Sequence, residues 1–220
     1  MTPTLLIDGR SGSGKTELAT QLARETGAQL VRMDALYPGW RGLAAGSALV
    51  TAMLTTGRWQ RWDWEHSQPA EWHEVDLLRP LIVEGCGALT AANRALASRG
   101  IWLTLDAATR KQRALARDGD TYAPHWDEWA AQEDAFILRE NPAALADDRV
   151  DGRVSFAAEG PTTSADRGDR HTVIPEGSPA RSTDRGDGHV SFPTGQPATS
   201  TPLDLFARWR ALLDPARVEP

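Results

Sequence analysis

The sequence predicts a doubly wound α/β domain, in which a five-stranded parallel sheet carries helices on both faces. Two observations lead to this prediction. Up to about residue 150, short β-forming runs alternate with helical patterns, which is typical of a parallel sheet covered by helices. A glycine-rich segment joins the first run to the first helix. With 220 residues, 40% of them hydrophobic, the chain is long enough to bury one core.

Each element is predicted from its apolar content or its periodicity. Strands are expected in the short apolar and β-branched runs, which are Thr4–Asp8, Gln29–Asp34, Pro80–Glu84 and Ile101–Asp106. A fifth is expected at Asp148–Val150, where charges weaken the pattern. Helices are expected where apolar residues recur at helical spacing, which are Lys15–Thr26, Thr90–Ser98, Ala107–Arg117 and Asp127–Glu140. The spacing in Leu203–Leu213 predicts a final amphipathic helix that docks on the core.

The character of the chain changes after residue 150. Residues 151–204 hold three copies of one 18-residue unit, which begin at Asp151, Asp169 and Asp187. Their proline, glycine and serine content leaves little apolar surface to offset the entropy of ordering the chain. A solenoid would need a hydrophobic ridge in every copy, and these copies offer only a few apolar residues each. We therefore expect a folded domain at 1–150, a disordered tandem insertion at 151–202 and a C-terminal segment at 203–220.

The composition disfavours several classes of partner. A formal net charge of −6 argues against a nucleic-acid or anionic-membrane surface, since those partners need clustered cations. Asp8 interrupts the only apolar stretch near the start, and no run approaches the length of a membrane span. The single cysteine, Cys86, excludes an internal disulfide. We expect a cytoplasmic protein with no nucleic-acid or membrane partner, and the sequence makes no prediction of its oligomeric state.

The first expected strand is followed directly by a phosphate-binding motif. Residues 9–16 read GRSGSGKT, a complete GxxxxGK(S/T) loop. Small residues let the backbone form a concave nest of N–H groups, and the next helix adds the positive end of its dipole. The strand before the loop and the helix after it favour an ATP site over a plain glycine-rich turn, with Lys15 on the β- and γ-phosphates and the Thr16 hydroxyl on Mg²⁺. The residues predicted to bind the nucleotide are Gly9, Ser11, Gly12, Ser13, Gly14, Lys15 and Thr16.

Two carboxylates are expected at the same edge of the sheet. Asp34 ends the second expected strand and Glu84 ends the third, and the carboxyl ends of parallel strands share one edge. Asp34 could accept a proton from an attacking hydroxyl or hold the water shell of the metal, or it could be a simple cap or turn residue. Glu84 is a candidate Mg²⁺ partner, or else it caps its strand and pairs with a surface arginine.

These residues resemble the P-loop nucleoside kinases of the uridine kinase and phosphoribulokinase group. The resemblance covers residues 4 to about 120 and includes the GRSGSGKT loop, Asp34-x-x-Tyr37, the IVEGxxAL pattern from Ile82, and an arginine-rich helix introduced by Asp106. In that family the matching aspartate is the catalytic base and the matching glutamate helps to hold Mg²⁺. The resemblance implies the same roles for Asp34 and Glu84.

The arginine-rich helix carries Arg110, Arg113 and Arg117 on one face, because they lie three and seven residues apart. Three cations together repel one another unless an anion lies nearby. From spacing alone they could equally be a solvated face paired with Asp106 and Asp118. The resemblance implies a lid around residues 110–125 whose arginines clamp the transferring phosphoryl group. We expect Arg113 and Arg117 to do so.

The acceptor is expected to bind in a flap around residues 37–75, which is rich in tryptophan. The family segment that contacts a nucleoside base is matched best by Trp62-Asp63-Trp64-Glu65-His66, although tryptophans replace the usual aromatics and the usual arginine is absent. The tryptophans could be core or pocket wall. Glu133 projects from an apolar stripe of its helix, so it either contacts substrate or forms a buried ion pair. The acceptor-site candidates are Tyr37, Trp62, Trp64, His66 and Glu133.

The sequence therefore predicts an ATP- and Mg²⁺-dependent kinase that phosphorylates a hydroxyl of a nucleoside or related metabolite. Lys15, Asp34, Arg113 and Arg117 are the expected catalytic residues, and Thr16, Glu84 and Asp34 the expected metal partners. The alternative is a P-loop regulatory protein that hydrolyses ATP slowly and acts through a protein partner.

Overall fold

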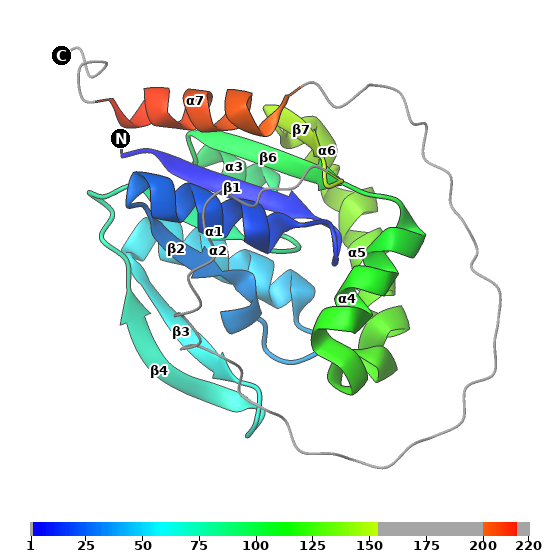
Figure 1. Cartoon of the computed structure of the whole chain (residues 1–220). Helices are drawn as coiled ribbons and strands as arrows, with labels where there is room; N and C mark the ends of the chain where they lie inside the picture. Colours follow the sequence, from blue (N-terminus) through cyan, green and yellow to red (C-terminus); the bar gives the residue numbers. More distant parts are fainter. Residues whose placement is uncertain (1, 154–199, 215–220) are drawn as a thin grey trace, which may run out of the picture.

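The computed structural model describes residues 2–153 and 200–214. Its main sheet has five strands in the order β2-β5-β1-β6-β7, all parallel, with β1 at the centre (Figure 1). The predicted fifth strand near Asp148 is present and forms one edge of this sheet. The strands are β1 (Thr4–Gly9), β2 (Gln29–Arg32), β5 (Leu81–Glu84), β6 (Arg99–Thr104) and β7 (Asp148–Asp151).

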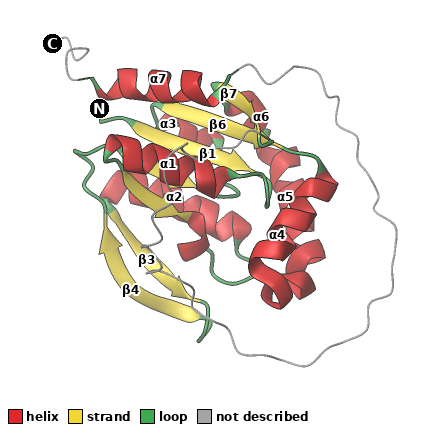
Figure 2. Ribbon diagram, in the orientation of Figure 1, coloured by secondary structure: helices red, strands yellow, loops and turns green. Residues whose placement is uncertain are grey.

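Helices cover both faces of the sheet (Figure 2). Side chains alternate along a strand, so Leu5 and Ile7 of β1 join one hydrophobic cluster and Leu6 joins the other. Helices α1 and α7 pack on the first face, and α2 and α5 pack on the second. The predicted doubly wound α/β fold is confirmed. The helices are α1 (Lys15–Thr26), α2 (Leu43–Thr56), α3 (Ala91–Ala95), α4 (Ala107–Tyr122), α5 (Trp126–Glu140), α6 (Pro142–Leu145) and α7 (Pro202–Leu213).

Residues 37–75, expected to form a flap, contain elements that the sequence analysis did not predict. Helix α2 is followed by an antiparallel hairpin of β3 (Arg58–Asp63) and β4 (Gln68–Glu74), which lies on the opposite side of the molecule from α7 (Figure 1). Helix α2 was missed because its sequence, LAAGSALVTAMLTT, is apolar or small on every side. No polar face alternates with an apolar one, and such alternation is the main sign of a helix.

Four predicted elements need corrected bounds. Strand β6 covers Arg99–Thr104, two residues earlier at each end than the predicted Ile101–Asp106. Strand β2 ends at Arg32, and Asp34 lies in a single turn of 3₁₀ helix over Met33–Ala35. Helix α3 covers only Ala91–Ala95. Helix α4 continues past Arg117 to Tyr122, with a break in its backbone at Gly119.

Helix α7 is joined to the edge of the sheet by a buried carboxylate. Asp148 of β7 accepts hydrogen bonds from Arg99 of β6 at 2.6 Å, from Ser200 at 2.8 Å and from Arg208 of α7 at 2.5 Å. Three donors stabilise the ionised carboxylate and lower its pKa, although burial acts in the opposite direction. Within the described residues, no helix is long and apolar enough to cross a membrane. The predicted repeats lie almost wholly in 154–199, outside the described residues.

If α7 completes the core, removing its main apolar anchor should destabilise the whole domain. Trp209 is only 1% exposed and packs in the cluster that contains β1 and α1. We expect Trp209→Ala to lower the free energy of unfolding by about 3–5 kcal/mol, through lost burial and the cavity left behind. Arg210→Ala is the matched control because it removes only a surface ion pair with Glu25, worth about 1 kcal/mol or less. Urea unfolding measures both, and equal effects would contradict a core role for α7.

Candidate active site

The GRSGSGKT loop connects the end of β1 to the beginning of α1 and forms the floor of the site. Gly14 precedes α1 in a left-handed conformation, and no side chain caps the helix. The N–H groups in the first turn of a helix have no partner within the helix. They are therefore available, together with the helix dipole, to a phosphate group.

The loop also presses closely against the helix that carries the arginines. A side chain at Gly12 would lie 2.2 Å from the backbone oxygen of Arg110, and the φ of Gly12 is +78°. Both facts require glycine at this position. At this point the loop packs backbone against backbone on α4, so a single added methyl group would displace it.

Lys15 is buried beneath the loop. Its ammonium group donates to the backbone oxygen of Arg10 at 3.0 Å and lies 3.6 Å from the Cys86 sulfur. Burial acts to lower its pKa, but the surrounding Cys86, Glu84, Glu133 and Asp8 outweigh burial and raise it. Lys15 is therefore a permanently charged group in a site of low dielectric, where charge interactions with an anion are strong.

Strand register brings three functional segments together at one edge. Glu84 pairs with Ile7 of β1 on one side and with Arg32 of β2 on the other. The phosphate loop begins two residues after Ile7, and Asp34 lies two residues after Arg32. Thr16 at the start of α1 donates its hydroxyl to the Glu84 carboxylate at 3.1 Å.

Glu84 is buried, whereas Asp34 is exposed at the same edge. Burial and the charge of Asp34 raise the pKa of Glu84, and the charge of Lys15, the Thr16 hydroxyl and Arg32 act to lower it. Two carboxylates and a hydroxyl are hard oxygen donors, which suit Mg²⁺. The donor set therefore fits the metal that the motif implies. A bound cation would in turn favour the ionised form of Glu84.

The arginines of α4 have three different surroundings. Arg110 is buried and donates to the backbone oxygens of Leu105 at 3.1 Å and Ser11 at 3.3 Å. Arg113 donates to the backbone oxygen of Gly152 at 2.8 Å, and Arg117 forms a two-bond pair with Asp118.

Of the two arginines expected to clamp phosphate, Arg117 interacts electrostatically with a carboxylate of the site. The hydrogen bonds with Asp118, followed by the charges of Asp118, Asp34 and Glu17, raise the pKa of Arg117 against the effect of burial. Arg113 instead contacts the chain that follows β7. The α4 arginine that donates a hydrogen bond to the phosphate loop is Arg110, and not Arg113 or Arg117, which were expected to act on phosphate.

The residues predicted to bind the acceptor also have different surroundings. Tyr37 is buried and donates its hydroxyl to the Cys86 backbone oxygen at 2.7 Å, so it supports the site from the core. Trp64 donates its indole N–H to the Asp34 backbone oxygen at 2.8 Å, which places the hairpin beside Asp34. The Trp62 indole nitrogen is buried without a partner among the described residues. His66 is bound to Asp63 at 2.9 Å and is largely exposed.

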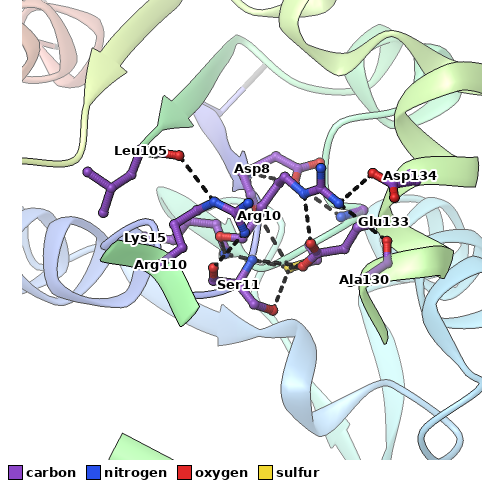
Figure 3. Close-up of polar contacts among 12 residues, drawn as sticks. Asp8, Arg10, Ser11, Lys15, Leu105, Arg110, Ala130, Glu133 and Asp134 are labelled. Carbon is purple, nitrogen blue, oxygen red and sulfur yellow. Dashed lines mark hydrogen bonds and ion pairs between the residues drawn. The ribbon is translucent and has the colours of Figure 1, made fainter. Parts of the chain in front are cut away.

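Glu133 of α5 contacts the phosphate loop, as Figure 3 shows. One of its oxygens accepts the Ser11 N–H at 2.7 Å and the other accepts from the Arg10 guanidinium at 3.0 Å. Arg10 also pairs with Asp134 at 2.5 Å. The buried ion pair, one of two roles left open for Glu133 by its sequence, is therefore present, and its partner is a residue of the loop.

One further buried carboxylate of the site was not among the predicted site residues. Asp8 is 1% exposed and accepts three backbone N–H groups, from Gly9 at 2.6 Å, Gly87 at 3.1 Å and Leu89 at 2.8 Å. It thereby joins the end of β1 to the segment after β5. Burial raises its pKa to about 7, while these N–H groups and Lys15 act to lower it. An aspartate inside an apolar strand was the signal, since a buried carboxylate needs hydrogen-bond donors.

Comparisons with known proteins give structural likenesses only. Neither a protein-family model nor a curated protein sequence matches the chain. Similar solved structures include a possible uridine kinase from Bacillus stearothermophilus, 18% identical, with a TM-score of 0.47 over 68% of this chain and 89% of that chain. Shikimate kinase from Acinetobacter baumannii is 17% identical, with a TM-score of 0.42 over 68% and 83%. A gluconokinase from Sinorhizobium meliloti 1021 is 16% identical, with a TM-score of 0.41 over 70% and 85%.

The contact between the loop and α4 can be tested at Gly12. We expect Gly12→Ala to lower the melting temperature and to weaken MgATP binding by at least about 10-fold, because the added methyl group displaces the loop from Arg110. Gly27→Ala is the matched control: its φ is also positive, at +68°, but nothing lies within 4 Å of the added atom. It should lower stability by about 1 kcal/mol and leave MgATP affinity unchanged. Parent-like MgATP binding by Gly12→Ala, measured by calorimetry, would show that the close packing does not shape the loop.

Proposed function

We propose that this protein is a small-molecule kinase, which transfers the γ-phosphate of ATP to a hydroxyl group of a nucleoside or related sugar-containing metabolite. One observation carries the proposal. The register of β5 between β1 and β2 gathers a phosphate loop, a buried glutamate and an exposed aspartate at one edge of the sheet. Phosphoryl transfer needs these three groups: a cradle for the phosphates, a metal partner, and a base for the attacking hydroxyl.

The loop and Lys15 are assigned to the nucleotide phosphates. The buried ammonium group has its charge fixed before any ligand binds, so it needs little reorganisation to meet the β- and γ-phosphates. Thr16 and Glu84 would hold Mg²⁺, either directly or through water. When bound, the ion neutralises phosphate charge.

Asp34 is assigned the role of general base. It is exposed at the edge where the loop opens, whereas Glu84 is buried beneath it and bonded to Thr16. An incoming hydroxyl can therefore reach Asp34. The Trp64 indole fixes the backbone at Asp34 through its hydrogen bond, so the base is held at a defined position. Positioning of this kind accounts for much of the catalysis of phosphoryl transfer.

Arg117 is our candidate for the charge that stabilises the transferring phosphoryl group. Its hydrogen bonds and charge pair with Asp118 raise its pKa most, and the charge of Asp34 adds to this effect, so the field of the base reaches Arg117. Arg113 remains a second candidate. To reach a phosphate, Arg113 would have to leave the Gly152 backbone oxygen, and Arg117 would have to leave the Asp118 carboxylate. For the acceptor, the hairpin tryptophans Trp62 and Trp64 are the proposed wall beside Asp34.

The assignment of the base predicts a selective loss. Asp34→Asn keeps the size of the side chain but removes the proton acceptor, so turnover should fall by roughly 10²-fold or more. The affinity for MgATP should change far less. Glu84→Gln is the comparison variant and should also raise the Mg²⁺ concentration needed for half-maximal rate. Steady-state rates and nucleotide titrations decide the question, and near-parental turnover in Asp34→Asn would contradict the assignment.

Kinase activity itself is tested by measuring ATP consumption with a panel of nucleosides, sugars and small alcohols. The proposal requires that at least one acceptor accelerates ATP consumption and becomes phosphorylated, as mass spectrometry of the product would show. Slow hydrolysis that responds to no acceptor, but changes when a protein partner is added, would instead support a P-loop regulatory protein.

A further inference from the structure

Ser11, in the middle of the phosphate loop, is held by two helices at once. Its N–H donates to the Glu133 carboxylate of α5 at 2.7 Å, and its backbone oxygen accepts from the Arg110 guanidinium of α4 at 3.3 Å (Figure 3). The two peptide groups on either side of Ser11 are therefore both fixed by buried charged side chains. Among the described residues, Glu133 and Arg110 are the two side chains that form hydrogen bonds with the Ser11 backbone.

Both carboxylate oxygens of Glu133 accept hydrogen bonds from residues of the loop. One accepts the Ser11 N–H and the Cys86 thiol at 3.2 Å, and the other accepts the Arg10 guanidinium at 3.0 Å. Burial acts to raise its pKa, but the charge of Arg10, the Ser11 N–H and Lys15 outweigh burial and lower it. The carboxylate is thus ionised, buried and saturated with donors from the loop and its surroundings. This arrangement leaves little capacity for an acceptor molecule.

Arg110 makes the corresponding contact from the other side. It is 7% exposed, and in the described residues it has no carboxylate within ion-pair distance. Its guanidinium is bonded to two backbone oxygens, those of Leu105 and Ser11. Its own backbone is the surface against which Gly12 packs. A buried cation is costly to desolvate, yet here it is used to hold the loop and not to neutralise a carboxylate.

We propose that Glu133 and Arg110 are positioning residues that preset the phosphate loop for the nucleotide by clamping the Ser11 backbone. The inference rests on the proposed function, since it concerns the affinity of the same loop for MgATP. The clamp does not touch the phosphates. It fixes the two peptide groups that flank Ser11, next to Gly12, and it joins the loop to α4, the helix that also carries Arg117.

The clamp predicts a specific effect on the nucleotide. In Glu133→Gln the side-chain NH₂ group replaces one acceptor oxygen, so the bond from either the Arg10 guanidinium or the Ser11 N–H to residue 133 is lost. A hydrogen bond to a charged group contributes enough that MgATP affinity should fall on the order of 10-fold. The Michaelis constant for ATP should rise in parallel, while that for the acceptor stays within about twofold. Glu128→Gln is the matched control, because Glu128 lies on the same helix and, among the described residues, forms its ion pair with the exposed Arg41.

Three measurements separate positioning from a merely structural role: MgATP titration calorimetry, steady-state kinetics with both substrates varied, and urea unfolding. If Glu133 is a positioning residue, Glu133→Gln raises the dissociation constant for MgATP and the Michaelis constant for ATP more than Glu128→Gln does. Parent-like MgATP affinity in Glu133→Gln, with stability alone reduced, would overturn the inference. A rise confined to the acceptor constant would also overturn it, since Glu133 would then be an acceptor ligand.

Arg110→Lys provides an independent variant in case Glu133→Gln does not fold. Lysine keeps the charge but lacks the planar fork that reaches both backbone oxygens. We expect MgATP affinity to fall several-fold in Arg110→Lys, and unchanged affinity would contradict the clamp. Failure of the proposed function has a different signature, because the parent chain itself would then bind no MgATP or would phosphorylate no acceptor.

Discussion

The hydrogen-bonded register of β5 between β1 and β2 is the constraint on which the rest of the site depends. It fixes Glu84 opposite Ile7 and Arg32, and so fixes the distance along the sheet edge between the phosphate loop and Asp34. Because β1 is central and buried on both faces, a slip of one residue would exchange Leu5 and Ile7 with Leu6 between the two clusters and disrupt the packing of both. The hydrophobic core therefore enforces the register, and through it the arrangement of the charged groups at the edge.

Buried charge is then used to hold the loop in shape. Asp8, Glu133 and Arg110 are each bonded to backbone groups in or beside the loop. Such groups are costly to bury unless their hydrogen bonds are satisfied. Here many of the partners are peptide groups, so the hydrogen bonds that offset the cost of desolvation also hold the backbone in place. On the proposed function, the loop would thus be ordered before an anion binds, and an electrostatic site ordered in this way avoids reorganisation.

The sequence predicted what depends on local pattern, and it missed what depends on tertiary contact. The phosphate loop, the five strands and the edge positions of Asp34 and Glu84 follow from motif and periodicity. Which α4 arginine meets the loop did not follow, because Arg110, Arg113 and Arg117 share one helical face and only the packing of Gly12 against α4 separates them. The partner of Glu133 could not be predicted either, since Arg10 lies 123 residues away in the chain. Helix α2 was missed because its uniform apolar character carries no period.

The central claim, that this edge of the sheet is a preformed MgATP site, is tested most directly by calorimetric titration of MgATP into the parent chain and into Lys15→Ala. The chain has one other lysine, Lys111, which lies over the Trp126 ring, so Lys111→Ala is the control for loss of a lysine charge. The account predicts that the parent and Lys111→Ala bind MgATP alike and that Lys15→Ala binds about 10- to 100-fold more weakly. Equal affinity in Lys15→Ala and the parent would contradict it.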